Sequence, residues 1–127
     1  MAQVIGPDFI VLYVRDIAAA RQFYIERLGL AVEPRFTRPD FVTFATRPIL
    51  FGIRQVPPSA TGSASPGLDL WLNCDDVEAL HTALVAAGAP IVRPPEDTPF
   101  GRRFICRDPD GYVLTIYRAI PLDQVRP

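Results

Sequence analysis

The segment LDLWLNC at residues 68–74 combines an acid, an indole and an amide with apolar side chains. Neighbouring residues of a strand point to opposite faces, so Asp69, Trp71 and Asn73 would share one face while the residues between them are apolar. An indole can stack on a flat molecule, and a carboxylate is costly to bury without a partner. We therefore expect this face to line a cavity, where Asp69 binds a polar or cationic ligand group. The structural alternative is an ion pair between Asp69 and a nearby arginine such as Arg102.

Residues suited to covalent catalysis are sparse. The single histidine, His81, lies off the apolar stripe of a predicted helix, and we expect it to be solvated or partly packed. No serine or cysteine has an evident histidine partner, which argues against a nucleophilic triad. Cys74 and Cys106 lack C-x-x-C spacing and are expected to be reduced, buried small side chains. We assign no catalytic residue.

Composition excludes several classes of partner. The chain has 127 residues, a formal net charge of −1 and a pI near 5.7, which gives no electrostatic reason to bind nucleic acid. No apolar run approaches the ~20 residues that span a bilayer. The amino terminus does not resemble a signal peptide. We therefore predict a cytoplasmic protein with no membrane or nucleic-acid partner.

The chain repeats one pattern of elements. VRDIAAARQFYIERLG at 14–29 and CDDVEALHTALVAAG at 74–88 each run from a strand end through an aspartate and an amphipathic stretch to a glycine. Asp16 and Asp76 are predicted to cap helices at their first turn, and Gly29 and Gly88 to end them. The apolar stripes are expected to be Ile17, Ala20, Phe23, Tyr24 and Leu28 in the first helix, and Val77, Leu80, Leu84 and Val85 in the second.

Strands are predicted around both helices. In the first half they lie at 8–15 and near 30–36, 41–46 and 48–54, and in the second at 68–74 and near 90–93, 102–107 and 112–118. Prolines at 57–66 and 94–99 predict loops, and DPDG at 108–111 predicts a type I turn. The fold class is α+β: a single domain, 1–127, of two βαβββ modules at 8–56 and 68–118, with a linker at 57–67 and a tail at 119–127. We expect the modules to form a curved mixed sheet around a cleft, with the helices outside.

The segments VRDIAAARQFYIERLGL and GRRFICRDPDGYVLTIY resemble the vicinal oxygen chelate superfamily, which includes glyoxalase I, extradiol dioxygenases, fosfomycin-modifying enzymes and bleomycin-resistance proteins. The resemblance covers about residues 8–118. It implies the paired-module fold but not one activity, because this fold hosts many functions.

The resemblance also implies where a divalent metal would be held. Family enzymes carry a histidine or glutamine on the first strand of a module and a glutamate on its last strand. Those positions are Phe9, Asp69 and Thr115 here, and the strand ILFGIR of the first module has no acid or histidine. A metal of this kind needs about three protein ligands, and Asp69 alone is one. We therefore predict no metal and no cofactor, as in the antibiotic-binding, bleomycin-resistance-type members that the chain resembles.

The resulting functional prediction is a homodimer that confers resistance by sequestering an aromatic or polycyclic drug, of the bleomycin, mitomycin or enediyne type, in a cleft at the dimer interface. Alternation along the strands assigns five aromatic residues to the inner face, and neutral hydrogen-bonding residues join them. Two alternatives stay open: a superfamily lyase, isomerase or dioxygenase with an atypical metal site, and a regulatory or accessory binding subunit. The predicted ligand-binding residues are Phe9, Val11, Tyr13, Phe51, Asp69, Trp71, Asn73, Phe104, Thr115 and Tyr117.

Overall fold

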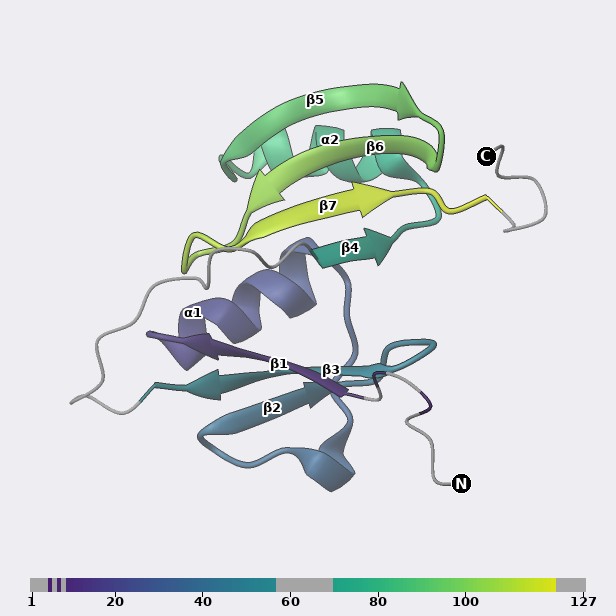
Figure 1. Ribbon diagram of the computed structural model, residues 1–127. Coiled ribbons are helices and arrows are strands. Elements are labelled where there is room, and N and C mark those ends of the chain that lie inside the picture. The colour runs from purple at the N-terminus through teal and green to yellow at the C-terminus, as the bar shows by residue number, and fades with distance from the viewer. Residues whose placement is uncertain (1–4, 6, 8, 57–69, 121–127) are drawn as a thin grey trace. The chain divides into compact units, whose positions relative to one another are not determined.

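A computed structural model describes residues 5, 7, 9–56 and 70–120 of the chain. The chain divides into two compact units, Met1–Gly62 and Ser63–Pro127, called unit 1 and unit 2 below. Each unit combines helical elements with one sheet, which confirms the predicted α+β class (Figure 1). The predicted linker lies outside the described residues. No helix in the described part of the chain is long and apolar enough to cross a membrane.

Unit 1 contains a three-stranded sheet in the order β1-β3-β2. Strand β1 (Phe9–Val14) is parallel to β3 (Leu50–Gln55), and β2 (Phe41–Phe44) is antiparallel to β3. Helix α1 (Ile17–Gln22) continues as the π-helical turn η1 (Phe23–Arg27), and the 3-10 turn η2 (Pro34–Phe36) precedes β2. The Gln55 side chain joins α1 to β3, because its oxygen accepts from the Ile17 backbone N–H at 2.9 Å.

The core of unit 1 lies between the helix and one face of the sheet. Tyr24 is fully buried, and its ring centroid is 5.7 Å from that of Phe44 and 5.2 Å from that of Phe51. Leu12 and Val14 of β1 are buried on the same face. The other face carries Phe9, Val11 and Tyr13 and is called the open face of unit 1.

Unit 2 contains a four-stranded sheet in the order β4-β7-β6-β5. Strand β4 (Leu70–Asn73) is parallel to β7 (Val113–Tyr117), while β6 (Gly101–Arg107) is antiparallel to both β7 and β5 (Ile91–Thr98). Helix α2 (Val77–Ala86) covers one face, where His81 meets Phe104 with ring centroids 5.3 Å apart. Between the sheet and α2 the buried hydrophobic side chains are Leu70, Val77, Leu84, Phe104, Cys106, Leu114 and Ile116.

Local signals in the sequence predicted the ends of the helices correctly. Asp16 Oδ1 accepts from the Ala19 N–H at 3.1 Å, and Asp76 Oδ1 accepts from the Ala79 N–H at 3.0 Å. Gly29 and Gly88 both have φ near +76°, a conformation that favours glycine. The turn at 108–111 is also present, with the Gly111 N–H donating to the Asp108 carbonyl at 3.0 Å.

Three local expectations were wrong. Around residues 30–36 there is no strand but a single bridge between Val32 and Phe44, followed by η2, because Pro34 has no N–H for a ladder and suits the start of a 3-10 turn. The prolines at 94–95 lie inside β5, which is an edge strand with register shifts on either side of Arg93 and so tolerates missing donors. Val85 is 54% exposed, not buried.

Candidate functional site

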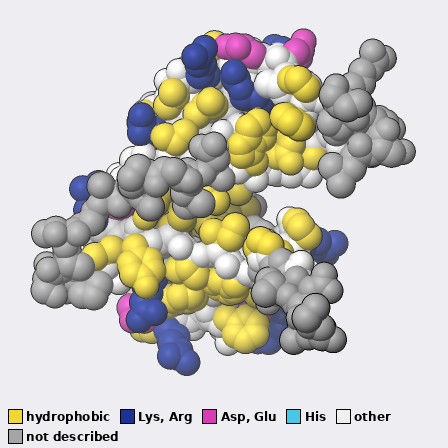
Figure 2. Space-filling model, in the orientation of Figure 1, with side chains coloured by type: hydrophobic (Ala, Val, Ile, Leu, Met, Phe, Trp, Pro, Cys, Tyr) yellow, Lys and Arg dark blue, Asp and Glu magenta, His cyan; other side chains and the backbone are white. Residues whose placement is uncertain are grey.

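The open face of unit 2, opposite α2, carries a cluster of three aromatic rings. Trp71 of β4 meets Tyr117 of β7 edge to face, with centroids 5.2 Å apart, and meets Phe100 in the same way at 6.0 Å. Trp71 is 43% exposed and Phe100 is 53% exposed, so the cluster offers ring surface to solvent. Figure 2 shows hydrophobic side chains gathered over this part of unit 2. We call these residues the Trp71 cluster.

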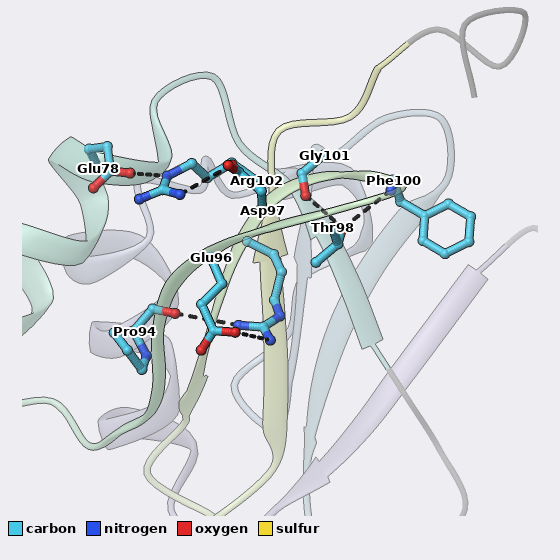
Figure 3. Close-up of polar contacts among 9 residues, drawn as sticks. Glu78, Pro94, Glu96, Asp97, Thr98, Phe100, Gly101 and Arg102 are labelled. Atoms are coloured by element: carbon cyan, nitrogen blue, oxygen red, sulfur yellow. Dashed lines mark hydrogen bonds and ion pairs between the residues drawn. The ribbon is translucent and has the colours of Figure 1, made fainter. Parts of the chain in front are cut away.

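Phe100 was not among the predicted site residues, and the β5–β6 turn presents it to Trp71. Thr98 Oγ1 accepts from the Phe100 N–H at 3.2 Å and donates to the Gly101 carbonyl at 2.6 Å, which holds the turn (Figure 3). Gly101 has φ of +128°, and a Cβ there would lie 2.1 Å from the Arg118 carbonyl oxygen. Gly101, directly after Phe100, could have indicated this contact from the sequence, since only glycine allows the chain to approach the end of β7 so closely.

Asn73 and Thr115 are the described residues among the polar ones predicted beside Trp71. Asn73 Oδ1 accepts from the Ala119 N–H at 2.9 Å, and Thr115, opposite Trp71 in the sheet register, is only 7% exposed. Asp69 lies outside the described residues. Thr115 is therefore buried in the sheet, whereas Asn73 holds the segment after β7 and is itself exposed.

Arginines of β6 form ion pairs with acids of β5 and of helix α2 (Figure 3). Arg102 pairs with Glu78 and, at 3.1 Å, with Asp97, and the hydrogen bond to Glu78 raises the pKa of Arg102 most. These pairs are exposed and contribute little to stability. Arg103 lies opposite Tyr117 in the register, so it belongs to the open face, and its guanidinium reaches toward β5, where it pairs with Glu96 at 3.4 Å and donates to the Pro94 carbonyl at 3.4 Å.

The open face of unit 1 carries the other predicted aromatic residues. The Phe9 ring lies over Gly52, where a Cβ would come within 3.3 Å of it, and its centroid is 6.1 Å from that of Phe41. Phe9 is 37% exposed and Tyr13 is 55% exposed, while Val11 between them is half-buried. Glycine at 52 leaves room for the Phe9 ring to lie flat on the sheet.

Phe51 and Phe104 are on the opposite faces from those predicted. Ile10 pairs with Phe51 and Leu12 with Ile53, so Phe51 points to the helix with the core residues and is 5% exposed. Phe104 pairs with Ile116 and is fully buried against His81. Alternation within a strand shows which residues share a face, but the register between strands decides which face that is.

The positions that the family resemblance assigns to a metal do not fit one in the described residues. Phe9 has no donor atom, and Thr115 offers a buried neutral hydroxyl. Among residues 5, 7, 9–56 and 70–120, no three histidine, cysteine or acidic side chains gather in a group that could hold a metal. A divalent ion needs about three such ligands.

The cysteines are poor nucleophiles. Burial raises the pKa of Cys106 to about 12, with a smaller contribution from Asp108. Burial also raises the pKa of Cys74, which is half-buried. Since the thiolate is the reactive form, neither side chain suits covalent catalysis near neutral pH.

Comparison with known proteins agrees with this arrangement. The family model described as the Glyoxalase/Bleomycin resistance protein/Dioxygenase superfamily matches residues 6–116. No curated protein matches the sequence.

Solved structures share the fold at low identity. A glyoxalase-related enzyme from Fulvimarina pelagi is 26% identical, with a TM-score of 0.75 over 91% of this chain and 88% of that one. A glyoxalase/bleomycin resistance protein/dioxygenase family enzyme from Burkholderia phytofirmans PsJN is 20% identical, with a TM-score of 0.73 over 89% and 98%. TnmS3, an antibiotic-binding protein from Streptomyces sp. CB03234, is 23% identical, with a TM-score of 0.71 over 94% and 100%.

Proposed function

Because the chain belongs to the Glyoxalase/Bleomycin resistance protein/Dioxygenase superfamily, we propose that it binds an aromatic small molecule and sequesters it without chemistry. The observation that carries this proposal is the Trp71 cluster, in which Trp71 and Phe100 keep much of their ring surface exposed. A folded domain gains nothing by leaving such rings in water, so their exposure favours a ligand. The aromatic ligand would stack on Trp71 between Tyr117 and Phe100.

The energetics are sufficient for sequestration. A drug-sized ligand gains up to ~0.3 kcal/mol per heavy atom. A ligand of ~35 such atoms would gain ~10 kcal/mol, which corresponds to a dissociation constant of tens of nanomolar. Binding alone therefore removes a drug effectively when the protein is abundant.

The finer parts of the proposal rest on family resemblance. The ligand is an antibiotic of the bleomycin, mitomycin or enediyne type, held in a cleft at the interface of a cytoplasmic homodimer whose protomers are each one domain of two modules. The fold similarity to TnmS3, named as an antibiotic-binding protein, supports this choice of ligand. In unit 2 the contact residues we propose are the Trp71 cluster with Arg103, Asp69, Asn73 and Thr115. In unit 1 we separately propose Phe9, Val11 and Tyr13 of its open face.

Fluorescence of the single tryptophan tests the proposal directly. Trp71 is partly exposed, so a drug stacked on it should quench or shift its emission during titration with bleomycin, mitomycin C and an enediyne. Phe100→Ala should weaken binding by about fivefold, as expected when one aromatic contact of ~1 kcal/mol is lost.

Val85→Ala is the matched control, because Val85 is exposed on the helix that covers the opposite face of the sheet. It should leave the affinity unchanged. If none of the three drugs changes the Trp71 fluorescence, and cells that express the chain are not protected, sequestration is contradicted.

A superfamily enzyme is the second candidate, favoured by the similarity to the glyoxalase-related enzyme from Fulvimarina pelagi. Elemental analysis of protein purified without chelator separates the two. Stoichiometric iron, manganese, nickel or zinc would favour the enzyme. Loss of that metal in the Asp69→Ala variant would identify Asp69 as one of its ligands.

A further inference from the structure

A pocket in unit 1 is lined by residues that the proposed function does not use. Its volume is about 320 Å³, and its walls are Arg35, Phe36, Arg38, Asp40, Phe41 and Arg54. Three of these six side chains are basic and two are aromatic, on a chain whose formal net charge is −1. We call it the arginine pocket.

The fold brings these residues together from separate segments. Phe41 of β2 pairs with Arg54 of β3. The turn before β2 is closed by hydrogen bonds from the Arg38 N–H to the Phe41 carbonyl at 2.7 Å and from the Phe41 N–H to the Arg38 carbonyl at 3.1 Å, so Arg38 is held beside Phe41.

The η2 turn supplies the remaining wall of the arginine pocket. Thr43 is fully buried, and its Oγ1 donates to the Phe36 carbonyl at 2.7 Å, which ties η2 to the sheet. Phe36 is 54% exposed, and the Arg35 guanidinium carbon lies 5.8 Å from its ring centroid. The aromatic and basic walls are therefore both positioned by backbone contacts.

The charges of the arginine pocket are unevenly neutralised. Arg35 pairs with Glu33. Arg38 and Arg54 make no ion pair with any residue in the described part of the chain, and both are exposed. Asp40 is the pocket's single acid and has no ion pair in that part either. Two guanidinium groups are thus available to a ligand beside aromatic surface.

We propose that the arginine pocket binds the carboxylate of a small aromatic acid, with Arg38 and Arg54 on the carboxylate and the ring beside Phe36 and Phe41. A guanidinium presents a planar fork of donors that matches a carboxylate, and aromatic faces suit a flat ring. The volume lies at the lower end for ligand pockets, which fits a ligand of one or two rings. This goes beyond the proposed function, because none of the contact residues proposed there, in unit 1 or in unit 2, lines the pocket.

Calorimetric titration of the full chain with 2-naphthoate, against 2-naphthylmethanol as its neutral counterpart, tests the proposal. The acid should bind at least about tenfold more tightly than the alcohol, and this advantage should shrink at high salt because exposed charges are screened. Arg38→Ala and Arg54→Ala should each weaken naphthoate binding by about tenfold. Arg54→Lys, which keeps the charge but not the fork, should fall between wild type and Arg54→Ala.

Arg21→Ala is the matched control, because Arg21 is an exposed arginine on α1 that does not line the pocket. It should bind naphthoate like wild type. Trp71→Phe should also leave naphthoate binding unchanged, so failure of this proposal and failure of drug sequestration can be told apart.

Several outcomes would overturn the proposal. These are equal binding of the acid and the alcohol, no binding of naphthoate, or wild-type affinity in both Arg→Ala variants. Binding of 2-naphthyl phosphate more than about tenfold tighter than naphthoate would replace the carboxylate with a phosphate ester as the ligand class. Circular dichroism of each variant checks that the fold is retained.

Discussion

At the residue scale, chemically similar side chains have opposite roles according to their position. Phe9 and Trp71 are exposed on open faces, whereas Phe51 and Phe104 are buried under the helices. Composition alone identifies an aromatic-rich chain but does not separate ligand-facing rings from core rings. The exposed rings are the candidates for binding because their burial by a ligand would remove apolar surface from water.

Cys106 provides a residue-scale prediction about stability. Its pKa is about 12 in the folded chain, against an ordinary value of 9.0, so the folded state holds the thiol proton more tightly than the unfolded chain does. This contribution to stability is complete below pH 9 and is lost as the pH rises toward 12. The free energy of unfolding should therefore fall across this window, by up to ~1.4 kcal/mol per pH unit from this group.

Urea unfolding at a series of pH values measures the effect. Cys106→Ala should be less stable at every pH, because it leaves a cavity, but its profile above pH 9 should be flatter than that of wild type. Cys74→Ala should keep most of the slope, since Cys74 is only half-buried. Equal slopes for wild type and Cys106→Ala would contradict the assignment.

At the element scale, helix caps and one glycine turn determine how the segments begin and end. Asp16 and Asp76 cap the two helices in the same way, and Gly101 allows the β5–β6 turn to approach Arg118 while it presents Phe100. The π-helical turn Phe23–Arg27 had no counterpart in the predicted helix. Its Leu28 N–H donates to the Phe23 carbonyl at 3.1 Å, a spacing that periodicity of side chains does not reveal.

Removal of one cap gives an element-scale prediction. Asp76→Ala should lower the free energy of unfolding by ~1 kcal/mol, because the Ala79 N–H loses its side-chain acceptor. Chemical denaturation measures this change. Asp75→Ala removes an equal charge one residue away from the cap and should have a clearly smaller effect, so similar losses in the two variants would argue against capping.

At the scale of the whole molecule, the two units have the same arrangement of sheet and helix but different surface residues. Each has a sheet with one helix-covered face and one open face. The open face of unit 2 is marked by the Trp71 cluster, and unit 1 adds the arginine pocket. The family positions for metal ligands hold Phe9 and Thr115 among the described residues, and the two proposed binding surfaces are aromatic and basic.

Chelation provides the prediction at this scale. Treatment of the purified chain with excess EDTA, followed by gel filtration, should leave the drug-induced change in Trp71 fluorescence unaltered, because the proposed binding uses ring contacts and no metal. Addition of zinc or manganese to the treated protein should have no effect either. Loss of drug binding on chelation, with recovery on metal addition, would favour the second candidate, a superfamily enzyme.

Much of the architecture follows from the sequence by itself. Caps, helix-ending glycines and strand alternation depend on neighbours within a few residues, so local sequence was enough to predict the roles of Asp16, Asp76, Gly29 and Gly88. The repeated motifs also indicated the superfamily, which the family model confirms over residues 6–116.

Only the tertiary structure decided which side chains meet. The register of β1 with β3 buried Phe51, the β5–β6 turn brought Phe100 to Trp71, and the pairing of Phe41 with Arg54 formed one wall of the arginine pocket. These contacts join segments that are distant along the chain. Local preferences determine the elements, but packing and hydrogen-bond register between strands determine which faces of those elements are buried and which are available to a ligand.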